Sequence, residues 1–259
     1  MPSAIIRVSL LILLFSFPQA VADETPSPEQ SVAQVRDDRE SVIQVNREAG
    51  TIDLKAKMVP AAPQWLELVA TVPGPTGREH EAIVTVNARP SEVHLVLITL
   101  GLEPGQPMTH RREGDELVTT LPTGPELALS FVYEKDGHTH EVPVHEWVFD
   151  QATGETIPPC RWLFAGSRFR TWQGREYYMA DEAGNIASLV NFGDDLIVRQ
   201  TGTTRDTDFQ QLQLDADRAL PFGEDLILRI RVPRPEDTNE EGHSPASPSQ
   251  DTDPGQSGE

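Results

Sequence analysis

The sequence is almost without cysteine, since Cys160 is the only one in 259 residues. A single thiol forms no intrachain disulfide, and it cannot supply the four thiolates of an iron–sulfur cluster or of a cysteine-rich zinc site. A chain this long can be stable without a disulfide because its core is large enough. Cys160 follows Pro158-Pro159 and precedes an apolar segment, so we predict a buried, unreactive thiol.

Basic residues are also scarce, with 21 Lys and Arg against 41 Asp and Glu and a net charge of -20. Nucleic-acid binding and attraction to an anionic membrane surface both need basic patches. The composition therefore argues against both as partners. A cationic partner or metal ions would suit the acidic balance better, although part of the excess charge lies in the two ends of the chain.

Long apolar runs are rare, and the clearest one lies at the start of the chain. Residues 8–17 follow Arg7 and precede the small-residue triplet Ala20-Val21-Ala22, an order typical of a secretory signal peptide cleaved after Ala22. A run of about ten residues is too short to cross a bilayer, which takes about twenty. Residues 1–22 therefore predict export to the periplasm or the medium, with no stable membrane span after cleavage. An uncleaved N-terminal anchor is the alternative.

Two further segments are poor in core-forming residues. Residues 23–40 combine prolines with a charge cluster, and residues 234–259 have no aliphatic or aromatic side chain larger than alanine. Such segments cannot bury enough apolar surface to offset chain entropy, so we predict a disordered linker and a disordered acidic tail. The folded domain is expected at residues 41–233.

Apolar and polar residues alternate through most of this domain, which predicts short strands joined by tight turns. Asp136-Gly137 is typical of a two-residue hairpin turn. Residues 79–86 are expected to pair with residues 65–72 across the turn at 73–77. The last strand is expected at residues 225–232, with one apolar face made by Leu226, Leu228 and Ile230.

One segment has helical spacing instead. Pro90 suits a first helical turn, Ser91 can cap it, and Gly101 is a typical stop. Leu95 and Ile98 leave little polar face, which predicts a largely buried helix. We therefore expect an α+β fold, mostly antiparallel β with one central buried helix. The face expected to carry the packing consists of Val93, Val96, Leu97 and Leu100.

Several motifs occur in an order that identifies a family. Gly77-Arg78-Glu79-His80-Glu81-Ala82-Ile83-Val84 begins the series, and further motifs follow at residues 89–94, 100–107, 145–148, 162–169, 178–181, 184–192 and 217–223. Together they resemble the YdjY-like domain of secreted bacterial proteins, common in planctomycetes. The resemblance spans about residues 65–233, and it implies a secreted domain without an established biochemical activity.

The first of these motifs holds most of the candidate binding residues, which are Glu79, His80, Glu81 and, further along, His94. In a strand, Glu79 and Glu81 would share one face and His80 would take the other. Two carboxylates on one face could bind a hard cation, or act as an acid/base pair if burial separates their pKa values. His94 could join them from the start of the helix. A solvated strand edge is the alternative.

Two other groups of residues have a plain structural alternative that we favour. His138 and His140 would share a strand face and could bind one metal ion, but a polar hairpin tip is the preferred interpretation. The aromatic residues are expected in the core, with an exposed aromatic face for glycans as the alternative. They are Trp65, Trp147, Trp162 and Trp172, with Phe164, Phe169, Tyr177 and Tyr178.

Known catalytic signatures do not occur. Gly166-Ser167-Arg168 lacks the pattern of a nucleophile elbow, and residues 181–185 lack the ligands of a calcium loop. We expect no cofactor, and we expect a non-catalytic binding or interaction module of the cell envelope with an unknown protein or small ligand as partner. The competing hypothesis is a metal-dependent enzyme or metal-binding protein that uses Glu79, Glu81 and His94.

The predicted signal cleavage can be checked on exported protein. The basic start, the short apolar run and the Ala-Val-Ala triplet predict that the mature chain begins at Asp23. Mass spectrometry of the exported protein should find Asp23 or a close neighbour at the N-terminus. Mature protein that still carries Met1 would contradict cleavage.

Overall fold

The computed structural model describes residues 41–59, 65–204 and 211–233. The chain divides into two units, residues 1–40 and 41–259, and every described residue belongs to the second. The predicted signal peptide, the linker at residues 23–40 and the tail at residues 234–259 lie outside the described residues. None of the helices in the described part has the length and apolarity that a membrane span requires.

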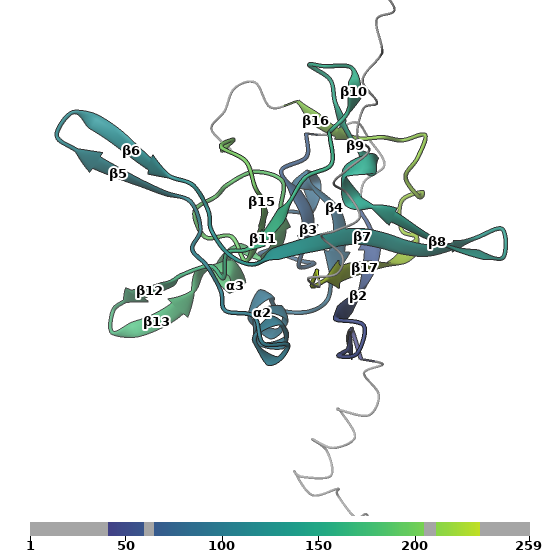
Figure 1. Ribbon diagram of the computed structural model, residues 1–259, viewed down its shortest axis with the longest axis horizontal. Helices are drawn as coiled ribbons and strands as arrows, with labels where there is room; N and C mark the ends of the chain where they lie inside the picture. The colour runs from purple at the N-terminus through teal and green to yellow at the C-terminus, as the bar shows by residue number, and fades with distance from the viewer. Residues whose placement is uncertain (1–40, 60–64, 205–210, 234–259) are drawn as a thin grey trace, which may run out of the picture. The chain divides into compact units, whose positions relative to one another are not determined.

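Eight strands of the described domain pair in a closed ring, which makes a β-barrel (Figure 1). The ring closes where β4 pairs antiparallel with β2, through Ala56–Val86, Lys57–Thr85 and Met58–Val84. Two neighbouring pairs, β3–β4 and β14–β15, are parallel, and the others are antiparallel. Around the ring the order is β2 (Thr51–Met58), β17 (Asp225–Arg231), β7 (Glu126–Lys135), β11 (Trp162–Phe164), β15 (Ile197–Arg199), β14 (Asn185–Ser188), β3 (Leu68–Thr71) and β4 (Ala82–Val86).

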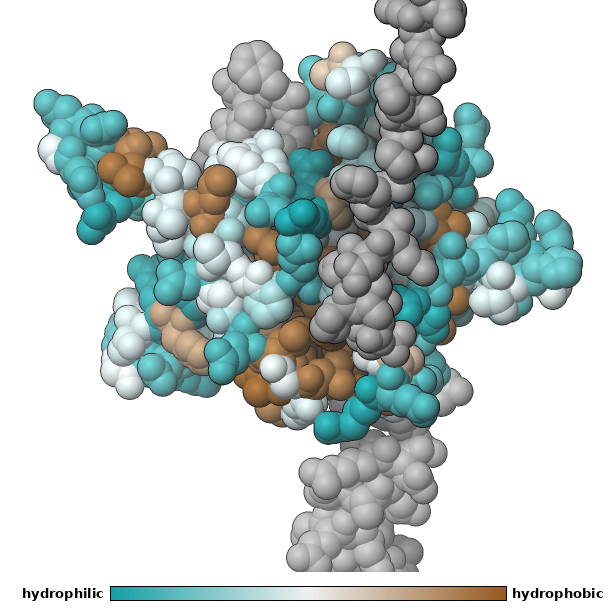
Figure 2. Space-filling view, in the orientation of Figure 1, coloured by the Kyte–Doolittle hydropathy of each residue, from teal (hydrophilic) through white to brown (hydrophobic). Residues whose placement is uncertain are grey.

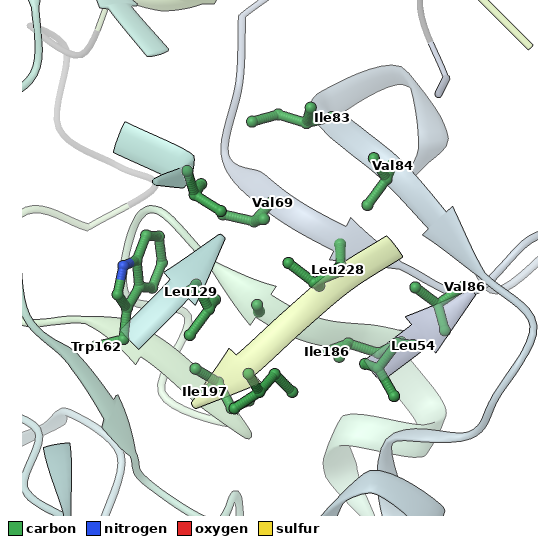
Figure 3. Packing of buried hydrophobic residues seen from close by; sticks show 14 of the residues in the cluster. Leu54, Val69, Ile83, Val84, Val86, Leu129, Trp162, Ile186, Ile197 and Leu228 are labelled. Atoms are coloured by element: carbon green, nitrogen blue, oxygen red, sulfur yellow. The ribbon is translucent and has the colours of Figure 1, made fainter. Parts of the chain in front are cut away.

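On the long strands β2, β7 and β17, the side chains that fill the barrel interior lie at every second position. On β17, Leu226, Leu228 and Ile230 are buried, which confirms the predicted apolar face of the last strand. Figure 3 shows side chains from β2, β17, β4 and β14 in one core, among them Leu54, Leu228, Val86 and Ile186. The outward position of β17 at Arg229 pairs in register with Asp53, and two hydrogen bonds of 2.7 Å join them. Alternation thus separates an apolar interior from an ion-paired exterior.

The remaining strands extend or decorate this barrel. β1 (Ile43–Asn46) pairs with β2, and β8 (His138–Pro143) pairs with β7 across the predicted Asp136-Gly137 turn, where both residues have positive φ. A small sheet combines β10 (Glu155–Thr156), β9 (Val148–Asp150) and β16 (Leu212–Leu214). Two hairpins with no strand in the ring project from the barrel in Figure 1: β5 (Thr109–Glu113) with β6 (Glu116–Thr120), and β12 (Phe169–Trp172) with β13 (Arg175–Tyr178).

Helical segments are short and few in the described residues. They are the 3₁₀ turns η1 (Glu79–Glu81) and η2 (Val144–Trp147) and the α-helices α2 (Pro90–Thr99) and α3 (Met179–Ala183). The expectation of an α+β fold with a central buried helix was wrong, because the described residues are mostly in strands and α2 is the only helix of seven residues or more among them. A closed barrel fills its own interior, so α2 can pack only against the outside.

The details of α2 follow from this outer position. Val93 and Leu97 are fully buried, whereas Leu95 is 61% and Ile98 45% exposed, so the predicted nearly complete burial of the helix was also wrong. Figure 2 shows an apolar patch at the position of α2. The predicted stop at Gly101 is confirmed by its φ of 91° and its hydrogen bond to Ile98.

Two local predictions around this region need correction. Ser91 does not cap α2; Arg89 is the N-cap residue, and its backbone N–H donates to the Glu92 carboxylate at 2.8 Å. Residues 79–86 do pair with the preceding strand, as β4 with β3, but the pairing is parallel and the strand begins only at Ala82. The three residues before Ala82 form η1 instead.

Cys160 is partly buried, and burial raises the pKa of its thiol to about 11.

The packing of α2 can be tested with a matched pair of substitutions. Leu97→Asp would place an unpaired charge in a fully buried site, and we expect it to lower the free energy of unfolding by about 3–5 kcal/mol. Leu95→Asp lies two residues away on the exposed side and should change it by less than about 0.5 kcal/mol. Urea or thermal denaturation measures both. Equal stability of the two variants would contradict the outward orientation of Leu95.

Candidate functional site

The first candidate residues lie in η1, between β3 and β4. A 3₁₀ helix has three residues per turn, so Glu79 and Glu81 do not share one face as they would in a strand. The carboxylate of Glu79 accepts a hydrogen bond of 2.8 Å from the backbone N–H of Gly74 and thereby closes the turn after β3. His80 is exposed, with its Nε2 3.4 Å from the carboxylate of Glu81. The two carboxylates therefore have separate environments.

Glu81 belongs to a partly buried ion-paired group. The guanidinium of Arg78 pairs with Glu67 at 2.6 Å and also with Glu81, and it lies 4.3 Å from the ring centre of Phe192. Burial raises the pKa of Glu67, the negative charge of Glu81 raises it further, and Arg78 opposes both effects. The single cation between two carboxylates fixes η1 to the start of β3.

His94 lies elsewhere, with different partners. It follows β4 on α2, whereas η1 precedes β4, so the strand separates them. The Nδ1 of His94 is 2.6 Å from the Tyr178 hydroxyl, and that hydroxyl donates to the Gly166 carbonyl at 3.0 Å. Since the one phenolic proton is used for Gly166, Nδ1 of His94 carries the proton of the other bond. Burial lowers the pKa of His94, and its ring edge packs on Phe164.

The second predicted pair lies at the tip of the β7–β8 hairpin. His138 and His140 are exposed, and the ring of His140 stacks on Tyr133 with 5.4 Å between centroids. Across the described ranges, no three His, Cys, Asp or Glu side chains are grouped in a way that could hold a metal ion. Metal binding by His138 and His140 stays a prediction.

A pocket of about 480 Å³ lies beside the β12–β13 hairpin. The cross-strand pairs Arg170–Tyr177 and Trp172–Arg175 place these four side chains on one face of the hairpin. Trp172 is 61% exposed, and the guanidinium of Arg175 lies 5.4 Å from the ring centre of Tyr177. The lining residues are Arg170, Trp172, Tyr177, Met179 and Glu182.

The entry to this hairpin is fixed to the barrel through Ser167. Its backbone N–H donates to the Asp195 carbonyl at 2.8 Å, and its hydroxyl donates to the Asp194 carbonyl at 2.6 Å. The same hydroxyl accepts a hydrogen bond of 3.1 Å from the backbone N–H of Ala180 in α3. One side chain thus joins both ends of the hairpin to the loop between β14 and β15.

A second anchor connects the pocket wall with α2. The backbone N–H and the hydroxyl of Ser91 donate to the Asp181 carboxylate at 2.8 and 2.7 Å, and His94 holds Tyr178 as described above. Tyr178 lies between two lining residues, Tyr177 and Met179. His94, predicted as a site residue, therefore lies behind this pocket and not beside the acids of η1.

The aromatic prediction divides between core and surface. Trp147, Trp162 and Phe164 are buried, which confirms the expected core role. The same expectation was wrong for three others, because Trp65, Phe169 and Trp172 are between 51% and 66% exposed. Sequence reasoning missed Arg170, Met179 and Glu182 as lining residues. The available signal was the density of arginines and aromatics at residues 168–178 in an acidic chain.

The chain matches a known protein family. A family model described as the YdjY domain matches residues 43–228. No curated protein gives a significant match, and no solved structure does.

The role of Arg78 in the carboxylate group can be tested by removing its charge. Arg78→Met should lower the free energy of unfolding by about 2 kcal/mol at pH 7.5, because two partly buried carboxylates lose their shared cation. The raised pKa of Glu67 means that the folded state binds that proton more tightly than the unfolded chain. The loss should therefore shrink as the pH falls from neutral toward the acid range.

A suitable control is Arg161→Met, since the ion pair of Arg161 with Glu126 is largely exposed. Its removal should cost less than about 1 kcal/mol and show little change with pH. Urea denaturation at neutral and at acid pH measures both variants. Equal losses at both pH values would mean that Arg78 does not offset the charges of Glu67 and Glu81.

Proposed function

Because the chain belongs to the YdjY domain family, with a match over residues 43–228, we propose that it is an exported, non-catalytic ligand-binding module of the cell envelope. The family assignment leaves the ligand open. We place the binding site at the pocket beside β12–β13. Export rests on the signal peptide predicted from residues 1–22.

The exposed indole of Trp172 in the wall of a pocket is the observation that carries this proposal. A large aromatic side chain in solvent contributes nothing to the core, whereas aromatic and arginine side chains in pockets are frequent anchors for ligands. The pocket volume of about 480 Å³ is in the usual range for small-ligand sites. Ser167, Asp181 and His94 hold the walls, so little ordering is needed when a ligand binds.

The chemistry of the lining favours binding over catalysis. Nucleophilic catalysis by Ser, Cys, Thr or Lys uses an adjacent base, and glycoside hydrolysis typically uses a pair of carboxylates. Among the described lining residues, Glu182 is the one carboxylate, and none is His, Ser, Thr, Cys or Lys. Arginine, aromatic rings and one carboxylate can recognise a ligand without transforming it.

The competing hypothesis of a metal-dependent site loses its geometric basis. It needs Glu79, Glu81 and His94 together, but the η1 acids contact Gly74 and Arg78, whereas His94 contacts Tyr178. No observation favours it over the pocket.

Trp172→Ala tests the pocket directly. Thermal shift and calorimetry would use the chain from Asp23 onward with maltotriose, chitotriose, trigalacturonate, a hyaluronan tetrasaccharide and triglutamate as probes at millimolar concentration. We expect at least one probe to raise the melting temperature of the native chain, because a ligand that binds only the folded state stabilises it. Trp172→Ala should abolish that shift without loss of stability, since the side chain is exposed.

Trp65→Ala is the matched control, because Trp65 is 51% exposed and does not line the pocket. It should bind the same probe as the native chain does. The proposal fails if no probe binds, or if a bound probe is unaffected by Trp172→Ala.

A further inference from the structure

We infer that the ligand of the β12–β13 pocket is an acidic saccharide, a sugar ring that carries a carboxylate or a similar anionic group. This inference rests on the proposed function and adds the chemical class of the ligand. It comes from the charges on the hairpin and from the arrangement of its aromatic rings.

The hairpin is a basic segment in an acidic protein. Residues 168–178 contain Arg168, Arg170 and Arg175 against one acid, Glu176, while the whole chain carries a net charge of -20. Several other guanidinium groups have carboxylate partners, as Arg161 has with Glu126. Within the part of the chain that the structure describes, none of the three hairpin arginines forms an ion pair. Their charges are therefore available to an anionic group from outside.

Cations and rings alternate on one face of the hairpin, from which Arg170, Trp172 and Tyr177 line the pocket. Arg170 lies opposite Tyr177 across the hairpin, and Trp172 lies opposite Arg175. Directly opposite residues are about 5 Å apart at Cβ, and residues two apart on one strand are about 7 Å apart. The two arginines thus occupy diagonal corners of a small four-sided face, and the two rings occupy the other corners. This face is close in size to one sugar ring.

Each component of the face suits a different part of an acidic sugar. The π-face of Trp172 is electron-rich and attracts the weakly positive C–H groups on one side of a pyranose. The ring of Tyr177 beside it has the Arg175 guanidinium 5.4 Å from its centre. The forked guanidiniums of Arg170 and Arg175 match a carboxylate in geometry and charge. The carboxylate of Glu182 can accept hydrogen bonds from sugar hydroxyls.

The other anionic ligands fit less well. A nucleic acid would bring many phosphates close to a chain of net charge -20, which repels them. An acidic protein partner would need an interface of about 1,000 Å² or more. A pocket of about 480 Å³ suits one sugar unit or a short oligosaccharide instead. An acidic peptide is kept as an outcome of the test.

The test compares probes that separate the ring from its charge. Calorimetry would use trigalacturonate and a hyaluronan tetrasaccharide, the methyl ester of trigalacturonate as the same rings without charge, and triglutamate as charge without rings. We expect both acidic saccharides to bind the native chain, and added salt to weaken that binding. The methyl ester and triglutamate should each bind at least tenfold more weakly.

Two variants separate the contributions of the protein. Arg170→Gln with Arg175→Gln should weaken trigalacturonate binding at least tenfold, and Trp172→Ala should abolish it. Arg112→Gln removes one exposed arginine from the other hairpin, at β5, and should leave binding unchanged. Melting temperatures of all variants check that the fold is retained.

The outcomes distinguish the inference from the proposed function. Trp172-dependent binding of maltotriose, chitotriose or the methyl ester as tight as that of trigalacturonate would overturn the acidic class and leave the binding module standing. Equally tight binding of triglutamate would assign the site to acidic peptides and overturn the inference. If neither acidic saccharide binds, the inference falls, and if no probe binds, the proposed function falls with it.

Discussion

The pairing of β2 with β4 is the contact on which the rest of the domain depends. Three residue pairs, from Ala56–Val86 to Met58–Val84, convert a chain of neighbouring strands into a closed ring. Closure removes exposed strand edges from the ring and encloses the apolar side chains of β2, β17 and their neighbours. The interior is then full, so α2, α3 and both projecting hairpins must lie outside it. The candidate site is one consequence, because it is built from these outer elements.

The loop between β14 and β15 connects the barrel to the β12–β13 hairpin through hydrogen bonds with Ser167. The buried carboxylate of Asp195 accepts hydrogen bonds of 3.0 and 3.1 Å from the backbone N–H groups of Phe192 and Gly193. Burial raises the pKa of Asp195 to about 6, with these N–H groups opposing the effect. The backbone of the same loop accepts the hydrogen bonds of Ser167. A buried acid thus shapes the loop that holds the entry to the β12–β13 hairpin.

The candidate site was only partly predictable from sequence. The η1 residues were correctly singled out as a polar group, but Arg78 and Glu67 decide what Glu81 contacts, and Glu67 lies 14 positions earlier. His94 was also singled out, yet its partner Tyr178 is 84 residues away. The lining of the pocket combines a hairpin with α3, and only the register of β12 against β13 brings Arg170 and Tyr177 to one face. Spacing in the sequence carries no information on such long-range partners.

The sequence by itself determined the local features: the period-2 pattern of the last strand, the Asp136-Gly137 turn, the limits of α2 at Pro90 and Gly101, and the motifs of the family. These depend on alternation, on backbone conformations that few residues adopt and on short-range hydrogen bonds. The tertiary structure alone decided that the sheet closes, that α2 packs outside it and that Trp172 is exposed while Trp147 is buried. Burial depends on which strands meet, and the sequence pattern does not distinguish an apolar residue in a core from one on a pocket wall.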